Sequence, residues 1–280
     1  MGVIGRWMGR LAAAVTLVHP APTLAVVALS AALGAILLGQ AGSTLDERWL
    51  LVIASVAGSQ IFTGALNDIA DADRDAAAGR RDKPLASGRI SSSAALWVAS
   101  AGLALQLAAS WRLGSVALLL GLAAVGSAAV YDLFLSRTPL SPLPYMVSFG
   151  ILPLWIAAGV GVPAERVLPG VPLAAAFAAA AHLANTLRDY DADAAVGSRS
   201  LAQHLGRRRT HLLALGLALA VGLGVGTALL LGGRAGAASL ALGAIGLLAI
   251  GQGASGSRRL WFGVLVAAVA WTGAWALSTG

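Results

Sequence analysis

The sequence predicts an all-α protein, a polytopic membrane bundle of nine transmembrane helices. Of the 280 residues, 58% are hydrophobic and only 11% are charged, whereas about a quarter of the residues in an ordinary soluble domain are charged. A soluble fold of this length would expose far more surface than so few charged residues could cover. Apolar stretches about 20 residues long, enough to cross a bilayer core of about 30 Å, recur along the chain. The absence of cysteine excludes disulfides, Cys-ligated zinc, iron–sulfur clusters and thiol nucleophiles.

The predicted spans follow one another with short connections. The first contains His19-Pro20, so we expect it to be kinked or to begin as a short interfacial helix, because proline lacks the N–H that a helix interior requires. Spans three and four are separated only by Ser110-Trp111-Arg112 and form a tight hairpin. Several prolines cluster at the start of span five and in the loop before span six, where a missing N–H costs least. The nine spans are residues 11–38, 48–66, 93–109, 113–131, 140–161, 170–187, 209–231, 235–252 and 259–278.

No soluble domain or repeat interrupts these spans, so residues 1–280 are predicted to form a single integral-membrane domain. The net charge of +7 is unevenly distributed. With the N-terminus in the cytoplasm, most Lys and Arg fall on the inner side, which is the bias typical of membrane proteins. We therefore expect a protein integral to the cytoplasmic membrane and in contact with its lipid, with the N-terminus and the charged loops cytoplasmic. The basic excess then reflects topology rather than a nucleic-acid partner, and the sequence indicates no obligate protein partner.

Two of the inner loops hold more than half of the charged residues. The first loop begins with Asn67-Asp68 and continues through Asp71 and Asp75, and the second follows Asn185 with Asp189 and Asp193. If the second span continues as a helix, the three acids of the first loop lie at i, i+3 and i+7 and share a face with the asparagine. The two acids of the second loop lie at i and i+4, with their asparagine one turn earlier. The two loops therefore repeat one pattern at the ends of two apolar helices.

Carboxylates at these spacings repel one another unless a cation binds between them. Mg²⁺ commonly takes one or two carboxylates and completes its shell with waters and phosphate oxygens. An acid-rich loop that is merely solvated would be the simpler interpretation of either loop alone, but two such loops on one side of the membrane favour a binding site. The predicted metal ligands are Asp68, Asp71, Asp75, Asp189 and Asp193. The basic side chains near enough in sequence to neutralise a diphosphate between the clusters are Arg80, Arg81, Lys83, Arg188 and Arg199.

At these residues the sequence resembles the UbiA superfamily of intramembrane aromatic and lipid prenyltransferases. The family motif N-D-x-x-D-x-x-x-D is matched from Asn67 to Asp75, and its D-x-x-x-D motif by Asp189 and Asp193. The family element K/R-P-L-x-x-G-x-I is matched from Lys83 to Ile90. The resemblance covers essentially the whole chain and implies a bundle of nine helices around a central cavity that is open to lipid at the side.

The resemblance also implies a reaction. Mg²⁺ and basic residues draw off the diphosphate of an isoprenyl diphosphate, and the allylic cation alkylates an aromatic or lipid-precursor acceptor. Many members carry Y-x-x-x-K after the fourth helix, but here Tyr131 is followed by Leu135 at the lysine position, and Arg137 is the candidate replacement. The expected catalytic residues are Asp71, Asp189, Tyr131 and Arg137. The expected diphosphate-binding residues are Asn67, Arg80, Arg81, Lys83, Asn185, Arg188 and Arg199, with Asp68 as a helper at the metal site.

Two alternatives share some of these features. An intramembrane terpene cyclase would use the same ionisation and trap the cation with the substrate's own double bond, and the motifs do not separate the two outcomes. A cation-coupled transporter would also bind ions through acidic pairs. Its expected sign is a set of ionisable residues near the middle of several helices, and the predicted spans contain almost none.

Overall fold

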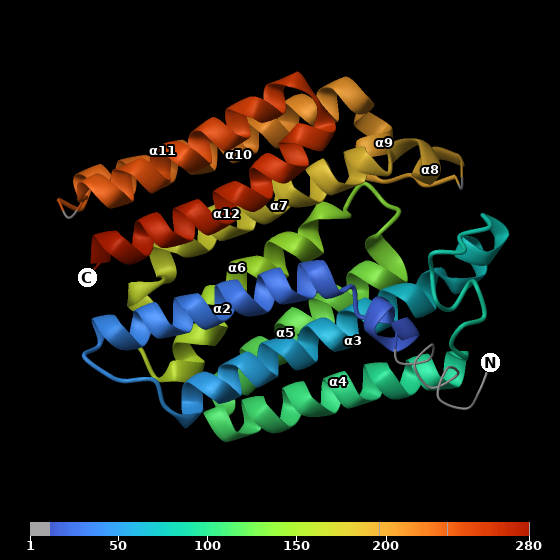
Figure 1. Cartoon of the computed structure of the whole chain (residues 1–280), viewed down its shortest axis with the longest axis horizontal. Helices are drawn as coiled ribbons and strands as arrows, with labels where there is room; N and C mark the ends of the chain where they lie inside the picture. The colour runs from blue at the N-terminus through green and yellow to red at the C-terminus, as the bar shows by residue number, and fades with distance from the viewer. Residues whose placement is uncertain (1–11, 196, 234, 280) are drawn as a thin grey trace.

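The computed structural model describes residues 12–195, 197–233 and 235–279, and all regular secondary structure among them is helical, with no strand (Figure 1). The short helices are a π-helical turn η1 (Tyr131–Leu135), the 3₁₀ turns η2 (Ala164–Arg166), η3 (Leu168–Gly170) and η4 (Gly253–Ser255), and the helices α8 (Tyr190–Ala195) and α9 (Leu201–Leu205). The long helices are α2 (Pro20–Gln40), α3 (Glu47–Ala77), α4 (Ser92–Leu113), α5 (Ser115–Val130), α6 (Pro142–Val160), α7 (Val171–Arg188), α10 (Arg207–Leu231), α11 (Ala237–Gln252) and α12 (Ser257–Thr279). The predicted all-α bundle is confirmed.

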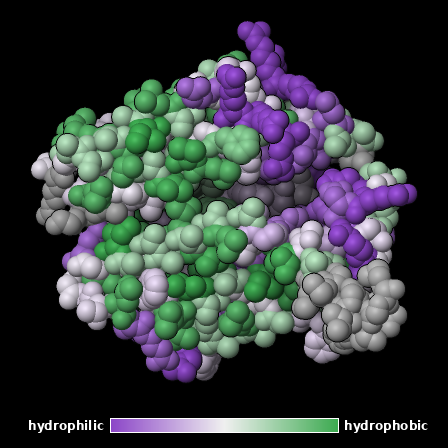
Figure 2. Space-filling model, in the orientation of Figure 1, coloured by the Kyte–Doolittle hydropathy of each residue, from purple (hydrophilic) through white to green (hydrophobic). Residues whose placement is uncertain are grey.

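The long helices are built to cross a membrane. Among the described residues, eight segments are long and apolar enough to do so, and α12, with 23 residues, occupies the place of the ninth predicted span. Large apolar side chains point outward along the bundle, with Leu231 83% and Trp97 77% exposed. Hydrophobic residues cover most of the visible face in Figure 2. Exposed apolar surface on this scale is the surface of an integral membrane protein facing lipid.

The helices lie side by side along the long axis of the molecule in two groups (Figure 1). In the first group, α7, α10, α11 and α12 pack around a core that includes Leu183, Ile250 and Trp271. In the second, α2, α3, α5 and α6 pack around Trp155 and its neighbours. Helix α4 lies against α3 where a Cβ on Gly58 would come within 2.6 Å of the carbonyl oxygen of Gly102. Small residues allow this close backbone approach, which is how membrane helices gain packing energy.

The first predicted span is divided, as the His19-Pro20 pair predicted. Residues 12–17 are helical, the chain then turns, and α2 begins only at Pro20. His19 adopts a left-handed conformation with φ 50°, which is uncommon for a residue that carries a Cβ. Proline at the first position of α2 fits, because its fixed φ suits a helix start and its missing N–H would be unpaired there. Residue 11, the first of the predicted span, lies outside the described residues.

The two motif-bearing helices end differently. Helix α3 has 31 residues, so at 1.5 Å per residue it is about 46 Å long, well beyond a bilayer core of about 30 Å. Its last turns therefore extend the first motif beyond the apolar layer, as expected. Helix α7, by contrast, ends at Arg188, and α8 begins after Asp189. The predicted span of residues 170–187 agrees with α7 to within one residue at each end. The Asp193 N–H donates to the Asp189 carbonyl oxygen at 2.9 Å, which keeps the two acids one turn apart.

Candidate active site

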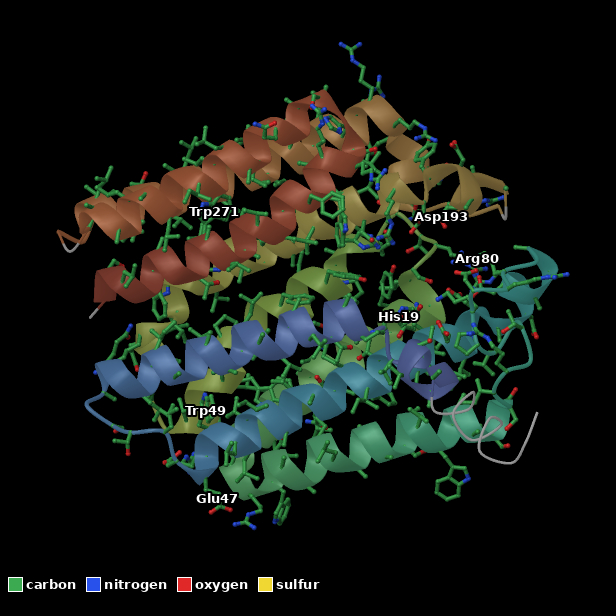
Figure 3. All side chains as sticks on the ribbon, viewed as in Figure 1. His19, Glu47, Trp49, Arg80, Asp193 and Trp271 are labelled. Carbon is green, nitrogen blue, oxygen red and sulfur yellow. The ribbon has the colours of Figure 1, made fainter. Side chains whose placement is uncertain are left out.

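The motif residues of both groups of helices gather at one end of the bundle. Figure 3 places His19, Arg80 and Asp193 together at this end, whereas Glu47 and Trp49 lie at the opposite end. Hydrophilic residues concentrate at the same end in Figure 2, beside a hollow between the two groups of helices. The charged groups thus border a depression whose other margins are apolar.

Asn67 and Asp132 link α3 to the turn that follows α5. The Asn67 Nδ2 donates to Asp132 Oδ1 at 3.0 Å. Asp132 lies in the π-helical turn η1 and is only 5% exposed. The residue spacing within one motif could not have shown this contact, because the two residues come from different helices.

Asp68 is buried and already paired. Its side chain accepts a hydrogen bond from Lys83 Nζ at 2.6 Å and contacts His19 Nε2 at 3.0 Å, and the residue is 2% exposed. Lys83 belongs to the loop after α3, and His19 immediately precedes α2. Asp68 therefore ties the loop and the start of α2 to the end of α3.

Asp71 is the acid of the first motif that two arginines approach. Arg74, one turn later on α3, forms an ion pair with it, and Arg137 Nη2 lies 3.4 Å from its Oδ1. Asp75, a turn further on, lies close enough to interact electrostatically with Lys83. A cavity of about 200 Å³ lies beside these groups, with Arg74, Asp132 and Arg137 in its wall. Arg137, the expected replacement for the family's lysine, thus reaches the first motif.

The second motif faces the first. Asp189 directly follows α7 and pairs with Arg188 at 3.1 Å, while Asn185 lies half-buried one turn earlier. Asp193 on α8 is half-buried. Burial, together with the negative charges of Asp189 and Asp71, raises its pKa to about 6. An interaction between Asp193 and Asp71 requires that the two motifs lie close together, which is the arrangement predicted for a shared binding site.

The predicted basic residues divide into two groups. Arg80 forms a bidentate ion pair with Asp82, in which Nε donates to Oδ1 at 3.0 Å and Nη2 donates to Oδ2 at 2.8 Å. This pair raises the Arg80 pKa and lowers the Asp82 pKa to about 2. The Arg80 charge also interacts with Asp189 of the other motif. By contrast, Arg81 and Arg199 are exposed, and their side chains form no ion pair with the described residues. The Arg199 backbone N–H does donate to the Arg137 carbonyl oxygen at 3.1 Å, so the two inner loops touch.

Tyr131 sits in an aromatic cluster next to the charged groups. Its ring centroid lies 5.0 Å from that of Tyr145, edge to face, and 5.6 Å from His182. His182 is 1% exposed, and its Nε2 lies 3.0 Å from Ser141 Oγ. The face of an aromatic ring can stabilise a cation. The site therefore combines charged side chains with aromatic rings that can stabilise positive charge.

The family of the chain follows from comparison with known sequences. The model of the UbiA prenyltransferase family matches residues 27–277. The chain belongs to this family. A comparison with curated proteins found no match.

Solved structures share the UbiA fold with this chain. A structure of digeranylgeranylglyceryl phosphate synthase is 18% identical with a TM-score of 0.72, covering 96% of this chain and 99% of that one. An apo UbiA homolog from Aeropyrum pernix K1 is 22% identical with a TM-score of 0.73, covering 89% and 96%. A UbiA homolog from Archaeoglobus fulgidus bound to GPP and Mg²⁺ is 20% identical with a TM-score of 0.62, covering 78% of each chain. At identities of 18%, 22% and 20%, this structural similarity shows that the fold is shared.

This UbiA chain brings together several residues that the motifs alone did not indicate. Arg74 stands three residues after Asp71, a spacing that places both side chains on one helix face and could have signalled the pair. Asp132 is an acid at the end of an apolar span, where ionisable residues commonly have a function. The Arg207 guanidinium lies 4.6 Å from the Tyr190 ring centroid and pairs with Asp191, a contact that none of the motifs indicates.

Proposed function

We propose that this UbiA-family protein catalyses the Mg²⁺-dependent transfer of an isoprenyl group from a prenyl diphosphate to an aromatic or lipid-precursor acceptor within the membrane. The observation that carries the proposal is the approach of two acidic motifs, from α3 and from α7–α8, at one end of an apolar bundle. Asp193 lies close enough to both motifs for the negative charges of Asp189 and Asp71 to raise its pKa. Opposed carboxylates of this kind suit a divalent cation with a phosphate ligand between them.

The residues present fit the metal chemically. The carboxylates of Asp71, Asp75, Asp189 and Asp193 are hard oxygen donors, and Asp68 serves as a helper through Lys83. Among the described residues no three His, Asp or Glu side chains form a ready-made metal-binding group, and Mg²⁺ commonly takes one or two carboxylates with the rest of its shell from water and phosphate. When bound, the metal supplies positive charge that stabilises the diphosphate as it leaves.

Basic and amide side chains of the chain bind the diphosphate in this proposal. Arg80 stands between the motifs, since its charge interacts with both Asp75 and Asp189. Arg137 enters from the loop after η1, two residues beyond the position that the family gives to a lysine, and reaches Asp71. The remaining groups are Asn67, Arg81, Lys83, Asn185, Arg188 and Arg199. Their hydrogen bonds strengthen as the bridging C–O bond breaks and negative charge collects on the leaving oxygen.

The carbon part of the reaction takes place on the apolar side of these groups. The C1–O bond breaks with both electrons going to the diphosphate, which leaves an allylic cation. Tyr131 and Tyr145 offer ring surfaces that stabilise positive charge. The apolar helices exclude water, which would otherwise capture the cation. The acceptor then forms a bond to C1 and loses a proton, which completes the transfer.

The site faces the cytoplasm in this proposal, since the positive-inside bias places both charged loops there. The first described residues and the motif loops lie at one end of the bundle, and α12 ends at the other (Figure 1). The predicted cytoplasmic N-terminus itself, residues 1–11, lies outside the described residues.

Product analysis tests the proposal. The purified protein is supplied with Mg²⁺, prenyl diphosphates of increasing chain length and a panel of acceptors, and the products are identified by mass spectrometry. We expect prenylated acceptor and released diphosphate from the wild type, and neither from Asp71→Ala or Asp189→Ala. Asp73→Ala is the matched control, because Asp73 lies in the same motif region but is exposed and off the shared face. Full turnover by the Asp71 or Asp189 variant would contradict the proposal, and terpene formed without any acceptor would identify a cyclase instead.

A further inference from the structure

A buried carboxylate stands in the π-helical turn that ends α5. The Ser136 N–H donates to the Tyr131 carbonyl oxygen at 2.8 Å, which closes the wide turn over five residues. Within this turn Leu133 and Phe134 are 53% and 70% exposed, whereas Asp132 is 5% exposed. The turn therefore places two apolar side chains outward and the acid inward. π-Helical turns inside helices occur frequently at functional sites.

The hydrogen bond from Asn67 fixes the orientation of its amide. An ionised carboxylate can only accept hydrogen bonds, while an amide has a donating and an accepting end. With Nδ2 donating to Asp132 Oδ1 at 3.0 Å, the carbonyl oxygen of Asn67 is the end left for another partner. Asn67 and Asp71 lie one turn apart on α3, so this oxygen belongs to the same helix face as the first motif.

Asp132 has little value as a stabilising residue. Its second oxygen, Oδ2, is buried and has no hydrogen-bond partner among the described residues. Arg74 and Arg137 line the same small cavity, but their ion pairs are made with Asp71. A buried carboxylate with an unsatisfied oxygen reduces the free energy of unfolding, because it loses hydration without full compensation. A group that is kept at such a cost calls for a functional explanation.

We propose that Asp132 is a positioning residue, which holds the Asn67 amide so that its carbonyl oxygen is presented to Mg²⁺ and the diphosphate. The proposal rests on the proposed function, because it assigns a role within the same site. Residues that orient metal ligands in this way typically change metal affinity by about 10- to 100-fold when they are lost. The family's tyrosine-and-lysine motif does not include this acid, so the role belongs to this chain's own residues.

The test compares two substitutions that differ in one property. Asp132→Asn keeps an oxygen that can accept from Asn67 Nδ2, whereas Asp132→Leu has a similar size and no acceptor. The readout is the dissociation constant of an uncleavable geranyl thiolodiphosphate, measured by titration calorimetry with and without Mg²⁺. We expect Asp132→Leu to weaken Mg²⁺-dependent binding by about tenfold or more, and Asp132→Asn to bind nearly as tightly as the wild type. Equal losses in both variants would overturn the proposal, because they would show that the charge of Asp132 matters rather than its acceptor.

Two controls separate positioning from structural damage. In an Asn67→Ala background, Asp132→Leu is expected to cause no further loss, because the residue through which it acts is gone. Ser127→Ala removes a half-buried hydrogen bond of α5, from Ser127 Oγ to the Pro144 carbonyl oxygen at 3.0 Å, and is expected to leave binding unchanged. If Asp132→Leu does not fold, Asp132→Ala replaces it under the same expectation.

The failure of this inference is distinguishable from failure of the proposed function. A wild-type protein that shows no Mg²⁺-dependent binding of the analogue would refute the proposed function. Wild-type binding together with unchanged binding by Asp132→Leu would refute only the positioning role of Asp132. An additional loss from Asp132→Leu in the Asn67→Ala background would likewise refute it, since Asp132 would then act on another group.

Discussion

Replacing Asp68 by asparagine should reveal whether this acid holds the site together or binds the metal. The Asp68 side chain is 1% exposed and that of its partner Lys83 is 17% exposed, with 2.6 Å between Oδ1 and Nζ. Removing one partner of a buried ion pair costs about 3–5 kcal/mol, and the lower figure applies because Lys83 lies on a loop that can move toward water. A loss of about 3 kcal/mol corresponds to an unfolding midpoint lower by roughly 6–12 °C, at about 2–4 °C per kcal/mol for a chain near this size.

The loss of the Asp68 charge also weakens the contact with His19. A residue with a side chain held at φ 50° is kept in that conformation by its surroundings, at a cost of about 1–3 kcal/mol. The contact from His19 Nε2 to Asp68 Oδ1 at 3.0 Å is one such constraint. We therefore expect Asp68→Asn to loosen both the start of α2 and the loop that carries Lys83, and hydrogen exchange should rise in residues 78–91.

The assay measures the unfolding midpoint in detergent and the Mg²⁺-dependent affinity for an uncleavable prenyl diphosphate analogue. Asp68→Asn should lower the midpoint strongly, whereas Asp71→Asn should chiefly weaken binding. Asp82→Asn is the control, because its pair with Arg80 is solvent-exposed and such pairs contribute little. An Asp68→Asn protein with the wild-type midpoint and abolished Mg²⁺-dependent binding would refute this reasoning and make Asp68 a direct metal ligand.

Two further changes should have measurable effects. Arg48→Ala removes a guanidinium that donates to the carbonyl oxygens of Gly159 at 2.8 Å and of Leu113 and Ala158 at 3.2 Å. Because the ends of α4 and α6 then lose their cap, the free energy of unfolding should fall by about 2–3 kcal/mol. An unchanged unfolding midpoint would contradict this. Lowering the pH through about 6 protonates Asp193, and because Mg²⁺ binds only the ionised carboxylate, its apparent affinity should fall as the pH falls. Asp193→Asn should flatten this pH profile, and a wild-type affinity that is constant between pH 7 and 5 would exclude Asp193 as a ligand.

The sequence was sufficient to predict the helices, because a bilayer imposes one length and one composition on every span. It also predicted the break at His19-Pro20, since proline acts locally. It placed the end of the sixth span at residue 187, one residue before α7 ends at Arg188, but it did not predict the separate helix α8 that follows Asp189, where no glycine or proline stands. Gln203 Nε2 donates to the Tyr190 carbonyl oxygen at 2.7 Å, so the chain near this break is held by a residue of α9, and such a tertiary contact leaves no local signal.

The candidate site, too, could be predicted from the sequence only in part. Residues that share one helix face, such as Asn67 and Asp71, could be grouped from their spacing alone. The partners of these residues could not, because they come from other elements: Lys83 for Asp68, Arg137 for Asp71 and Asp132 for Asn67. Helical periodicity relates residues within one helix, whereas the assignment of partners depends on how the helices pack.

The ion pairs at the site bear on how metal and diphosphate would bind in the proposed function. Asp71 is paired with Arg74, Asp189 with Arg188 and Asp68 with Lys83, so the acids of both motifs are partly neutralised by basic residues, of which Arg188 and Lys83 are expected to bind the diphosphate. Mg²⁺ alone would have to displace arginines from carboxylates, and a diphosphate alone would meet those carboxylates directly. In the proposed function, binding of both would let the carboxylates turn to the metal and the arginines to the phosphate oxygens, so that each charge would exchange one partner for another. The proposed reaction therefore favours joint binding of metal and diphosphate at these ion pairs over binding of either one alone.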